Sequence, residues 1–324
     1  MDPSEPGDGD HGTLADVKDD MVLPFRTERG GARGRVVRLG SVVDEILTGH
    51  DYPEPVSELL GEAVALTAMF GASLKFEGNF ILQTETDGPV DLLVVDFQAP
   101  GGLRGCARFD TDKVAALQEA GDTEPSALLG HGHMAMTIDQ GPETDRYQGV
   151  VPLESVDLSQ AADTYFRQSE QLPTFVRVAV ARHYLPGSSE SGWTWRAGGL
   201  MVQHVTSEGG LEAGEDDPEV MVGEDDEDWN RVRILAETVE DHELLDPTLA
   251  PERLLYRLFH EERVRAYPAN PLSVYCKCSE ERIRGLLERF AADDLSDMVE
   301  DGKIIVTCEF CNRRYDFDAE LFVG

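Results

Sequence analysis

The motif Cys276-Lys277-Cys278 and the motif Cys308-Glu309-Phe310-Cys311 are separated by twenty-nine residues. The chain has only one other cysteine, Cys106, so this clustering is not ordinary core packing. Two close pairs separated by a foldable segment are what one tetrahedral Zn²⁺ requires, because each pair binds the ion from one side with its sulfurs about 2.3 Å away. The sequence therefore predicts one Zn²⁺ per chain, bound by four thiolates in the reduced state.

The alternative for these cysteines is a set of reduced, buried side chains that act as small apolar residues. That alternative explains neither the pairing nor the polar neighbours Lys277, Ser279, Glu309 and Asn312. The second pair has the usual spacing of zinc ligands, whereas the first pair is one residue tighter.

The segment between the pairs has the pattern of a small folded unit. A strand is expected at 304–306, and Ser279 is placed to cap a preceding helix. About fifty residues are few for an independent core, so metal binding is expected to supply much of the folding free energy. Four apolar residues recur at helical spacing and define one face of that helix: Ile283, Leu286, Leu287 and Phe290.

The charge of the chain excludes some partners. It has 28 basic and 63 acidic residues, a formal net charge of −35, which repels the phosphates of nucleic acids and of anionic membranes. Residues 1–20 lack the basic and apolar regions of a signal peptide. The longest uncharged apolar stretch, 63–74, is shorter than the roughly twenty residues of a membrane span. We therefore expect a cytoplasmic protein, where cysteines stay reduced and bind metals or do redox chemistry.

The order of apolar patterns predicts an α+β protein. The core is expected to be a mixed or antiparallel sheet with a few helices, followed by a helical linker and a small four-cysteine zinc domain. Eleven acids and no basic residue between 208 and 228 predict a solvated, disordered insert. The expected units are a disordered tail (1–20), an α+β core (21–206), the acidic insert (207–228), the helical linker (229–270) and the zinc domain (271–324).

Individual elements follow from periodicity and from glycine and proline positions. The linker is expected to contain one helix over 229–245, ended by Pro247, and a second that begins at Pro251. Ser41 is expected to cap a helix that ends near Gly49. Other helices are predicted at 56–74 and 155–171, with strands at 35–39, 79–84, 91–97, 103–109, 134–138, 147–152 and 175–181, and a final hairpin of 193–196 with 199–205.

The CxC and CxxC motifs, together with segments spread from about residue 36 to 317, resemble the bacterial redox-regulated chaperone family called heat shock protein 33. The acidic insert, the loop around 186–192, the N-terminal tail and Cys106 depart from the family pattern. A buried strand cysteine is expected at Cys106, with no part in the mechanism. The segments that carry the resemblance are 92–95, 101–105, 147–153, 165–166, 169–174, 197–199 and 257–262.

The resemblance implies an ATP-independent holdase that binds unfolding proteins under oxidative stress. It implies a protein that is inactive while reduced and zinc-bound, and that is activated when oxidants form disulfides, zinc is released and the linker unfolds. The activated form is expected to dimerise. Cys276, Cys278, Cys308 and Cys311 would be both the zinc ligands and the redox cysteines. Candidate client-binding residues lie in the linker: Trp229, Leu254, Leu255, Leu258 and Phe259.

The residues support this chemistry, and three other functions are weighed against it. Zinc-bound thiolates are deprotonated and therefore oxidisable, and a disulfide within CxC closes a strained ring that is easily reduced again. A nucleic-acid zinc ribbon conflicts with the net charge. A zinc hydrolase needs an open coordination position that four thiolates do not leave. The nearest alternative is a zinc-binding thiol-disulfide oxidoreductase, because CxxC can exchange disulfides.

Overall fold

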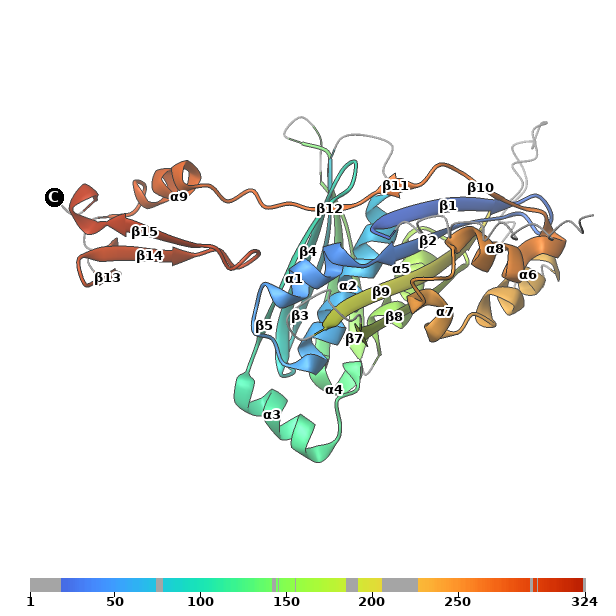
Figure 1. The fold of residues 1–324 in the computed structure, drawn as a ribbon, viewed down its shortest axis with the longest axis horizontal. Coiled ribbons are helices and arrows are strands. Elements are labelled where there is room, and N and C mark those ends of the chain that lie inside the picture. Colours follow the sequence, from blue (N-terminus) through green and yellow to red (C-terminus); the bar gives the residue numbers. More distant parts are fainter. Residues whose placement is uncertain are drawn as a thin grey trace, which may run out of the picture.

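The computed structural model describes residues 19–73, 78–141, 144, 146–154, 156–184, 192–205, 227–291, 294–295 and 297–322. Residues 1–18 of the expected N-terminal tail, most of the loop around 186–192 and most of the acidic insert lie outside the described residues. Two sheets with a helix between them form the core, helices cover one outer face, and a small unit extends from one side (Figure 1). The α+β class and the order of core, helical linker and four-cysteine unit agree with the sequence-based expectation.

The β1 sheet has the strand order β10-β1-β2-β9-β8, with β11 also paired to β1. All of its pairings are antiparallel. Two of its six strands are short pieces from after the linker helices, which the sequence did not predict. The strands are β1 (Met21–Thr27), β2 (Ala32–Leu39), β8 (Thr174–Tyr184), β9 (Trp193–His204), β10 (Val264–Ala266) and β11 (Asn270–Pro271).

The β5 sheet has the order β12-β5-β4-β3-β6-β7. The short β12 runs parallel to β5, whereas every other pairing is antiparallel. Cys106 is 8% exposed on β5 and Val94 is its register partner, as expected for a strand cysteine. The strands are β3 (Asn79–Thr86), β4 (Val90–Gln98), β5 (Gly102–Phe109), β6 (His131–Asp139), β7 (Tyr147–Glu154) and β12 (Ser273–Val274).

Helix α2 (Glu54–Gly71) lies between the two sheets and contacts strands of both. Its sequence is largely apolar, and most of its residues are buried in the main hydrophobic cluster. α1 (Ser41–Thr48) precedes it and packs on β9. The remaining core helices are α3 (Thr111–Ala120), α4 (Pro125–Leu129) and α5 (Leu158–Ser169).

Three expectations for the core were wrong. The predicted last hairpin is one continuous strand, β9, and the single large sheet is two sheets. Ser41 does not cap α1: its hydroxyl donates to Asp20, whose carboxylate also accepts from the backbone N–H groups of Gly40 and Val42. Asp20 therefore supplies the acceptor that a capping serine would have supplied.

The linker contains three helices instead of two. The predicted 229–245 helix is broken at 238–240 into α6 (Glu227–Glu237) and α7 (Asp241–Leu245), because Glu240 begins a new helix with a reciprocal capping box to Glu243. α8 (Pro251–Phe259) begins at Pro251 as predicted and continues into η1 (His260–Glu262). Together α6–α8 cover the outer face of the β1 sheet (Figure 1).

The C-terminal unit contains α9 (Glu280–Leu287) and a small sheet of β13 (Val299–Glu300), β14 (Lys303–Thr307) and β15 (Arg314–Asp318), followed by η2 (Ala319–Leu321). Ser279 caps α9 as predicted, since its hydroxyl accepts from Arg282 N–H at 3.2 Å. Leu286 and Phe290, which were expected on the apolar face, are about half exposed. No helix of the described chain is long and apolar enough to cross a bilayer.

Candidate metal centre and its contacts with the core

The four C-terminal cysteines converge on one point, with all four Sγ atoms within 4.8 Å of one another. The Sγ of Cys278 lies 3.2 Å from that of Cys276 and 3.3 Å from that of Cys311, and the Sγ atoms of Cys276 and Cys308 are 3.7 Å apart. Sulfurs bound to one tetrahedral Zn²⁺ at 2.3 Å would lie about 3.8 Å apart. The donor set and its dimensions therefore fit a zinc ion.

Local folding on both sides brings the two pairs together. Cys308 and Cys311 lie in the turn between β14 and β15, closed by a hydrogen bond from Asn312 N–H to Cys308 O at 2.8 Å. Asn312 has a φ of +53°, a left-handed conformation that asparagine tolerates. Beneath the cysteines, the C-terminal unit has a small apolar cluster of Ile283, Leu287, Leu295, Ile304, Phe317 and Ala319.

The pKa of Cys278 is lowered by the groups around its sulfur. The Tyr315 hydroxyl donates to its Sγ at 3.2 Å. Burial alone would raise the pKa of Cys278, but hydrogen bonds from Tyr315 and the neighbouring thiols outweigh it and lower that pKa to about 7. Burial raises the pKa of Cys311 to about 12. The thiol of Cys278 therefore ionises more readily than that of Cys311, and a bound cation would favour the thiolate form of both.

The turn that carries the second pair docks on the core. Arg104 on β5 lies over the Phe310 ring, with its guanidinium carbon 3.8 Å from the ring centroid. Its guanidinium also pairs with Asp96, and His50 Nε2 lies 3.3 Å from the carbonyl oxygen of Phe310. Tyr275, next to the first pair, also lies under Arg104, at 5.5 Å. The metal ligands are therefore attached to the edge of the β5 sheet.

The predicted client-binding residues all face the core. Trp229, Leu254, Leu255, Leu258 and Phe259 are each at most 5% exposed in one cluster with the outer face of the β1 sheet. The Phe259 ring stacks on that of Phe25, with centroids 5.5 Å apart. These residues pack on a surface of the β1 sheet that was not predicted from the sequence. It is formed by Met21, Leu23, Phe25, Val36, Leu200 and Val202.

Two buried arginines of the β1 sheet hold the end of α7. Arg38, fully buried on β2, donates to the carbonyl oxygen of Asp246 and to that of Leu249 at 3.2 Å. Arg196 on β9 donates to Leu245 O at 2.9 Å and binds Asp19 through both guanidinium NH groups. Burial lowers the pKa of Arg38, and Asp19 opposes that shift. These contacts bind the linker to the core through polar groups as well as through apolar packing.

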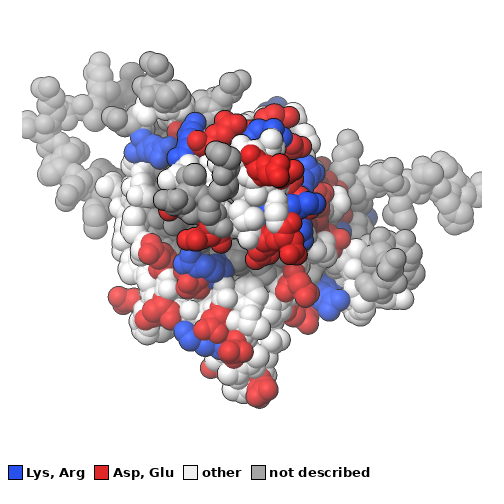
Figure 2. All heavy atoms as spheres, turned by 90° about the vertical axis from the view of Figure 1, so that its left-hand side faces the viewer, with Lys and Arg blue, Asp and Glu red and all other residues white. Residues whose placement is uncertain are grey.

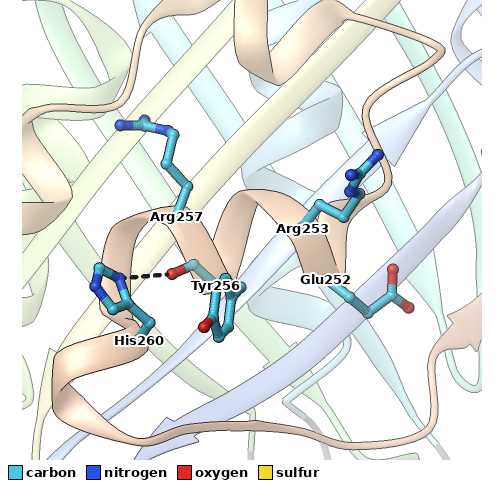
Figure 3. A pocket seen from close by; sticks show the side chains of 5 residues that line it. All are labelled: Glu252, Arg253, Tyr256, Arg257 and His260. Carbon is cyan, nitrogen blue, oxygen red and sulfur yellow. Dashed lines mark hydrogen bonds between the residues drawn. The ribbon is translucent and has the colours of Figure 1, made fainter.

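The outer face of α8 forms an open hollow, lined by Glu252, Arg253, Tyr256, Arg257 and His260 (Figure 3). Its only hydrogen bond between lining residues joins His260 Nδ1 to the Tyr256 carbonyl oxygen at 3.1 Å. Tyr256 is 67% exposed. All five residues belong to this helix and its end, and the hollow is separate from the cysteine cluster.

Figure 2 shows the face that bears the C-terminal unit, where acidic side chains are spread over much of the visible surface. Basic side chains lie among them and form no continuous band on the described part of that face. This distribution agrees with the overall charge of −35.

Comparison with known proteins identifies similar chains over almost the whole length. A family model described as Hsp33 protein matches residues 20–318. The 33 kDa chaperonin of Caulobacter vibrioides is 49% identical over 93% of this chain and 96% of that protein. The 33 kDa chaperonin of Ectopseudomonas mendocina is 36% identical over 94% of this chain and 96% of that protein. The crystal structure of the 33 kDa chaperonin from Thermotoga maritima has the same fold, with a TM-score of 0.71, 23% identity and coverage of 93% and 96%.

Proposed function

Because this chain belongs to the Hsp33 family and is a chaperone, not an enzyme, we propose that it is a redox-regulated, ATP-independent holdase. The reduced, zinc-bound protein is inactive. Disulfide formation, zinc release and linker unfolding activate it to bind unfolding proteins during oxidative stress. The observation that carries this proposal is the convergence of four Sγ atoms within 4.8 Å of one another.

Zn²⁺ is the ion proposed for this donor set, one per chain. Cys276, Cys278, Cys308 and Cys311 would hold it, and four thiolates without an open position are typical of structural zinc. A bound Zn²⁺ keeps all four sulfurs deprotonated and close together. Such sites contribute about 10 kcal/mol or more to small domains, as much as the whole stability of many domains.

Oxidation of the four sulfurs is the proposed trigger. Two thiolates form one disulfide and lose two electrons to one peroxide molecule, which takes up two protons and becomes two waters. Two such steps convert all four thiolates to two disulfides. Sulfurs in disulfides are poor metal ligands, so the C-terminal unit loses most of its stabilisation. Pairing within the CxC and CxxC motifs is proposed, since the two cysteines of each motif are only one or two residues apart in sequence.

The linker is proposed to unfold when the contacts that dock the C-terminal unit on the core are lost. The turn at Phe310 is attached to Arg104, and Tyr275 connects the first cysteine pair to the same arginine. Loss of the folded C-terminal unit removes these attachments and leaves the linker with its own contacts alone. The buried faces of α6 and α8 then become accessible to clients, as does the outer face of the β1 sheet. The linker residues proposed for client contact are Trp229, Leu254, Leu255, Leu258 and Phe259.

The proposed organisation keeps the units expected from sequence: tail 1–20, core 21–206, insert 207–228, linker 229–270 and redox unit 271–324. The proposed partners are unfolded or partly folded proteins and, after activation, a second copy of the chain. Cytoplasmic location is proposed from the cysteine use. Nucleic acids and membranes are not proposed as partners, since the net charge of −35 opposes both.

The test is a parallel measurement of zinc, free thiols and holdase activity before and after peroxide at elevated temperature. Loss of one zinc and four thiols, together with newly gained suppression of aggregation of a heat-unfolded protein, is expected. Zinc retention with unchanged activity would contradict the proposal. Turnover of an insulin-type disulfide substrate without zinc release would instead favour the oxidoreductase alternative.

A further inference from the structure

β1 would be an edge strand of the β1 sheet without the segment after the linker helices, which covers its otherwise open side. Its other side pairs with β2. The covering segment comprises β10, β11 and the residues between them. Three backbone hydrogen bonds mark the open side: Tyr267 N–H to Pro24 O at 2.9 Å, Leu272 N–H to Asp20 O at 2.7 Å, and Glu28 N–H to Arg263 O at 3.3 Å.

This cover is not a continuous strand. β10 pairs over three residues and β11 over two, with Pro268 between them. Arg26 faces Arg265, and continuing that register would place Ala269 opposite Val22, but Asn270 lies there instead. The pairing therefore shifts by one residue, which interrupts the ladder of hydrogen bonds. A continuous strand would pair with β1 more completely than this segment does.

Charge repulsion also weakens the pairing of the covering segment with β1. Arg26 has Arg33 opposite it on β2 and Arg265 opposite it on β10, so three arginines form a row across three strands. All three are exposed, and none forms an ion pair with another residue of the described chain. Like charges directly opposite each other destabilise a strand pair, and an opposite charge stabilises it. This row lies on a chain with net charge −35, yet no described acidic side chain pairs with it.

The other face of the same edge is apolar. Met21, Leu23 and Phe25 of β1 point into the cluster beneath the linker. On the covering strand, Ala266 is the register partner of Phe25 and Val264 that of Thr27, so only small or medium side chains extend this apolar face. A strand in this place needs apolar residues on one face and a polar or acidic residue opposite Arg26 on the other.

We propose that the edge of β1, once the covering segment leaves with the linker, binds an extended segment of a client protein as an added antiparallel strand. Backbone hydrogen bonds give this site its tolerance of sequence, because every client has a backbone. Alternating apolar residues extend the Phe25 face, and an acidic residue opposite Arg26 replaces the repulsion by Arg265 with attraction. The inference rests on the proposed function, since the linker must unfold to open the edge.

The first test measures binding of two alternating valine–threonine peptides, one with a central glutamate and one with a central lysine. Full-length protein activated by peroxide is expected to bind the glutamate peptide about two- to five-fold more tightly. The variant Arg26→Glu should reverse that preference. Arg253→Glu, on the outer face of α8, makes the same charge change away from β1 and should preserve it. Equal affinities for both peptides in the wild type would overturn the proposal.

The second test follows backbone amide exchange of the activated protein by NMR. A peptide added as a strand should slow exchange at the N–H groups of Val22, Arg26 and Glu28, which face the open side. The N–H groups of Met21 and Phe25 should not change, because they face β2. Binding without slower exchange at the open-side amides would place the peptide on the apolar face alone and overturn the proposal. Protection that rises with protein concentration without peptide would assign the edge to a second copy.

Different results would contradict the proposed function and the binding of clients at β1. A wild-type protein that gains no holdase activity after peroxide contradicts the proposed function, and the edge proposal with it. A wild-type protein that gains activity but shows neither charge preference nor amide protection contradicts only the edge proposal. Arg265→Glu adds a third readout: it should strengthen the cover and slow the gain of peptide binding several-fold, with unchanged thiol oxidation.

Discussion

Arg104 and Phe310 join the core to the metal centre: the guanidinium carbon of Arg104 lies 3.8 Å from the centroid of the Phe310 ring, and Phe310 lies between two of the four cysteines. Asp96 holds the guanidinium through a charge-assisted pair that is largely shielded from water. A change in the cysteine turn therefore acts first on a contact with β5. The nearby β12 pairs with the same strand and continues into the covering segment of β1.

The variant Phe310→Ala is expected to make activation easier. A cation–π pair contributes about 0.5–2 kcal/mol, so its loss should favour the undocked turn by roughly two- to thirty-fold. After peroxide treatment, holdase activity should appear at a lower temperature than in the wild type. The measurement is aggregation suppression across a temperature series, with zinc affinity checked by chelator competition.

Arg104→Gln should act in the same direction as Phe310→Ala, because it removes the cation from the same pair. Arg108→Gln is the matched control: Arg108 lies on the same strand but pairs with Asp91 at an exposed site, where an ion pair contributes little. An unchanged activation temperature in both Phe310→Ala and Arg104→Gln would show that this contact does not connect the metal centre to the linker.

The metal centre could be predicted almost completely from the sequence, because closely spaced pairs of cysteines are a local pattern. Spacing alone placed Cys276, Cys278, Cys308 and Cys311 at one point, and the structure brings them together. Long, largely apolar segments such as α2 could be predicted equally well. Surfaces formed by residues distant in sequence could not be predicted in this way. The sheet face beneath the linker is such a surface and was therefore missed.

Glycines misled the prediction of β9. The prediction placed a turn at Ala197 and Gly198, between strands 193–196 and 199–205, but both residues lie inside one strand. A Cβ at Gly198 would lie 2.2 Å from the carbonyl oxygen of Leu244, so this glycine permits close approach of α7 instead of a turn. The short β10, β11 and β12 have no periodicity to detect, because they pair over only two or three residues.

The variant Arg38→Met is expected to loosen the linker in the reduced protein. Methionine has a similar volume but cannot donate to the carbonyl groups of Asp246 and Leu249, and a buried group left unpaired costs about 1–3 kcal/mol. Amide exchange in α7 and α8 should therefore become faster without peroxide, and some holdase activity should appear. Arg233→Met, which removes an exposed i,i+4 pair on α6, is the control and should change neither. If amide exchange in α7 and α8 of Arg38→Met is as slow as in the wild type, the hydrogen bonds of Arg38 do not hold the linker in place.

Cys106 is expected to survive the oxidation that consumes the other four thiols. Burial, and then the charge of Glu309, raise its pKa to about 12, so almost no thiolate is present at neutral pH. Mass spectrometry after peroxide and alkylation should find Cys106 alkylated only once the protein is unfolded. Cys106→Ala should keep one zinc and normal activation, whereas Cys308→Ala should lose zinc. Oxidation of Cys106 at the rate of the clustered cysteines would contradict its inert role.

Glu62 on α2 should make the core less stable as the pH rises. Burial, followed by the charges of Asp157, Glu58 and Glu124, raises its pKa to about 8. In the unfolded chain this carboxyl titrates near its ordinary value of about 4.3. Between these two values the folded state holds a proton that the unfolded state has lost. The contribution of Glu62 to stability is therefore present in full below about pH 4.3 and declines as the pH rises towards 8.

The measurement is the melting temperature of the reduced protein at pH 5 and at pH 8.5. Glu62→Gln keeps the shape of the side chain but cannot ionise, so it should raise the melting temperature by several degrees at pH 8.5 and by much less at pH 5. Comparing the variant with the wild type at each pH removes the pH dependence of the cysteine cluster. Glu119→Gln, at an exposed site on α3, should leave the difference between the two pH values as in the wild type. An equal gain at both pH values for Glu62→Gln would show that packing, and not ionisation, causes the change.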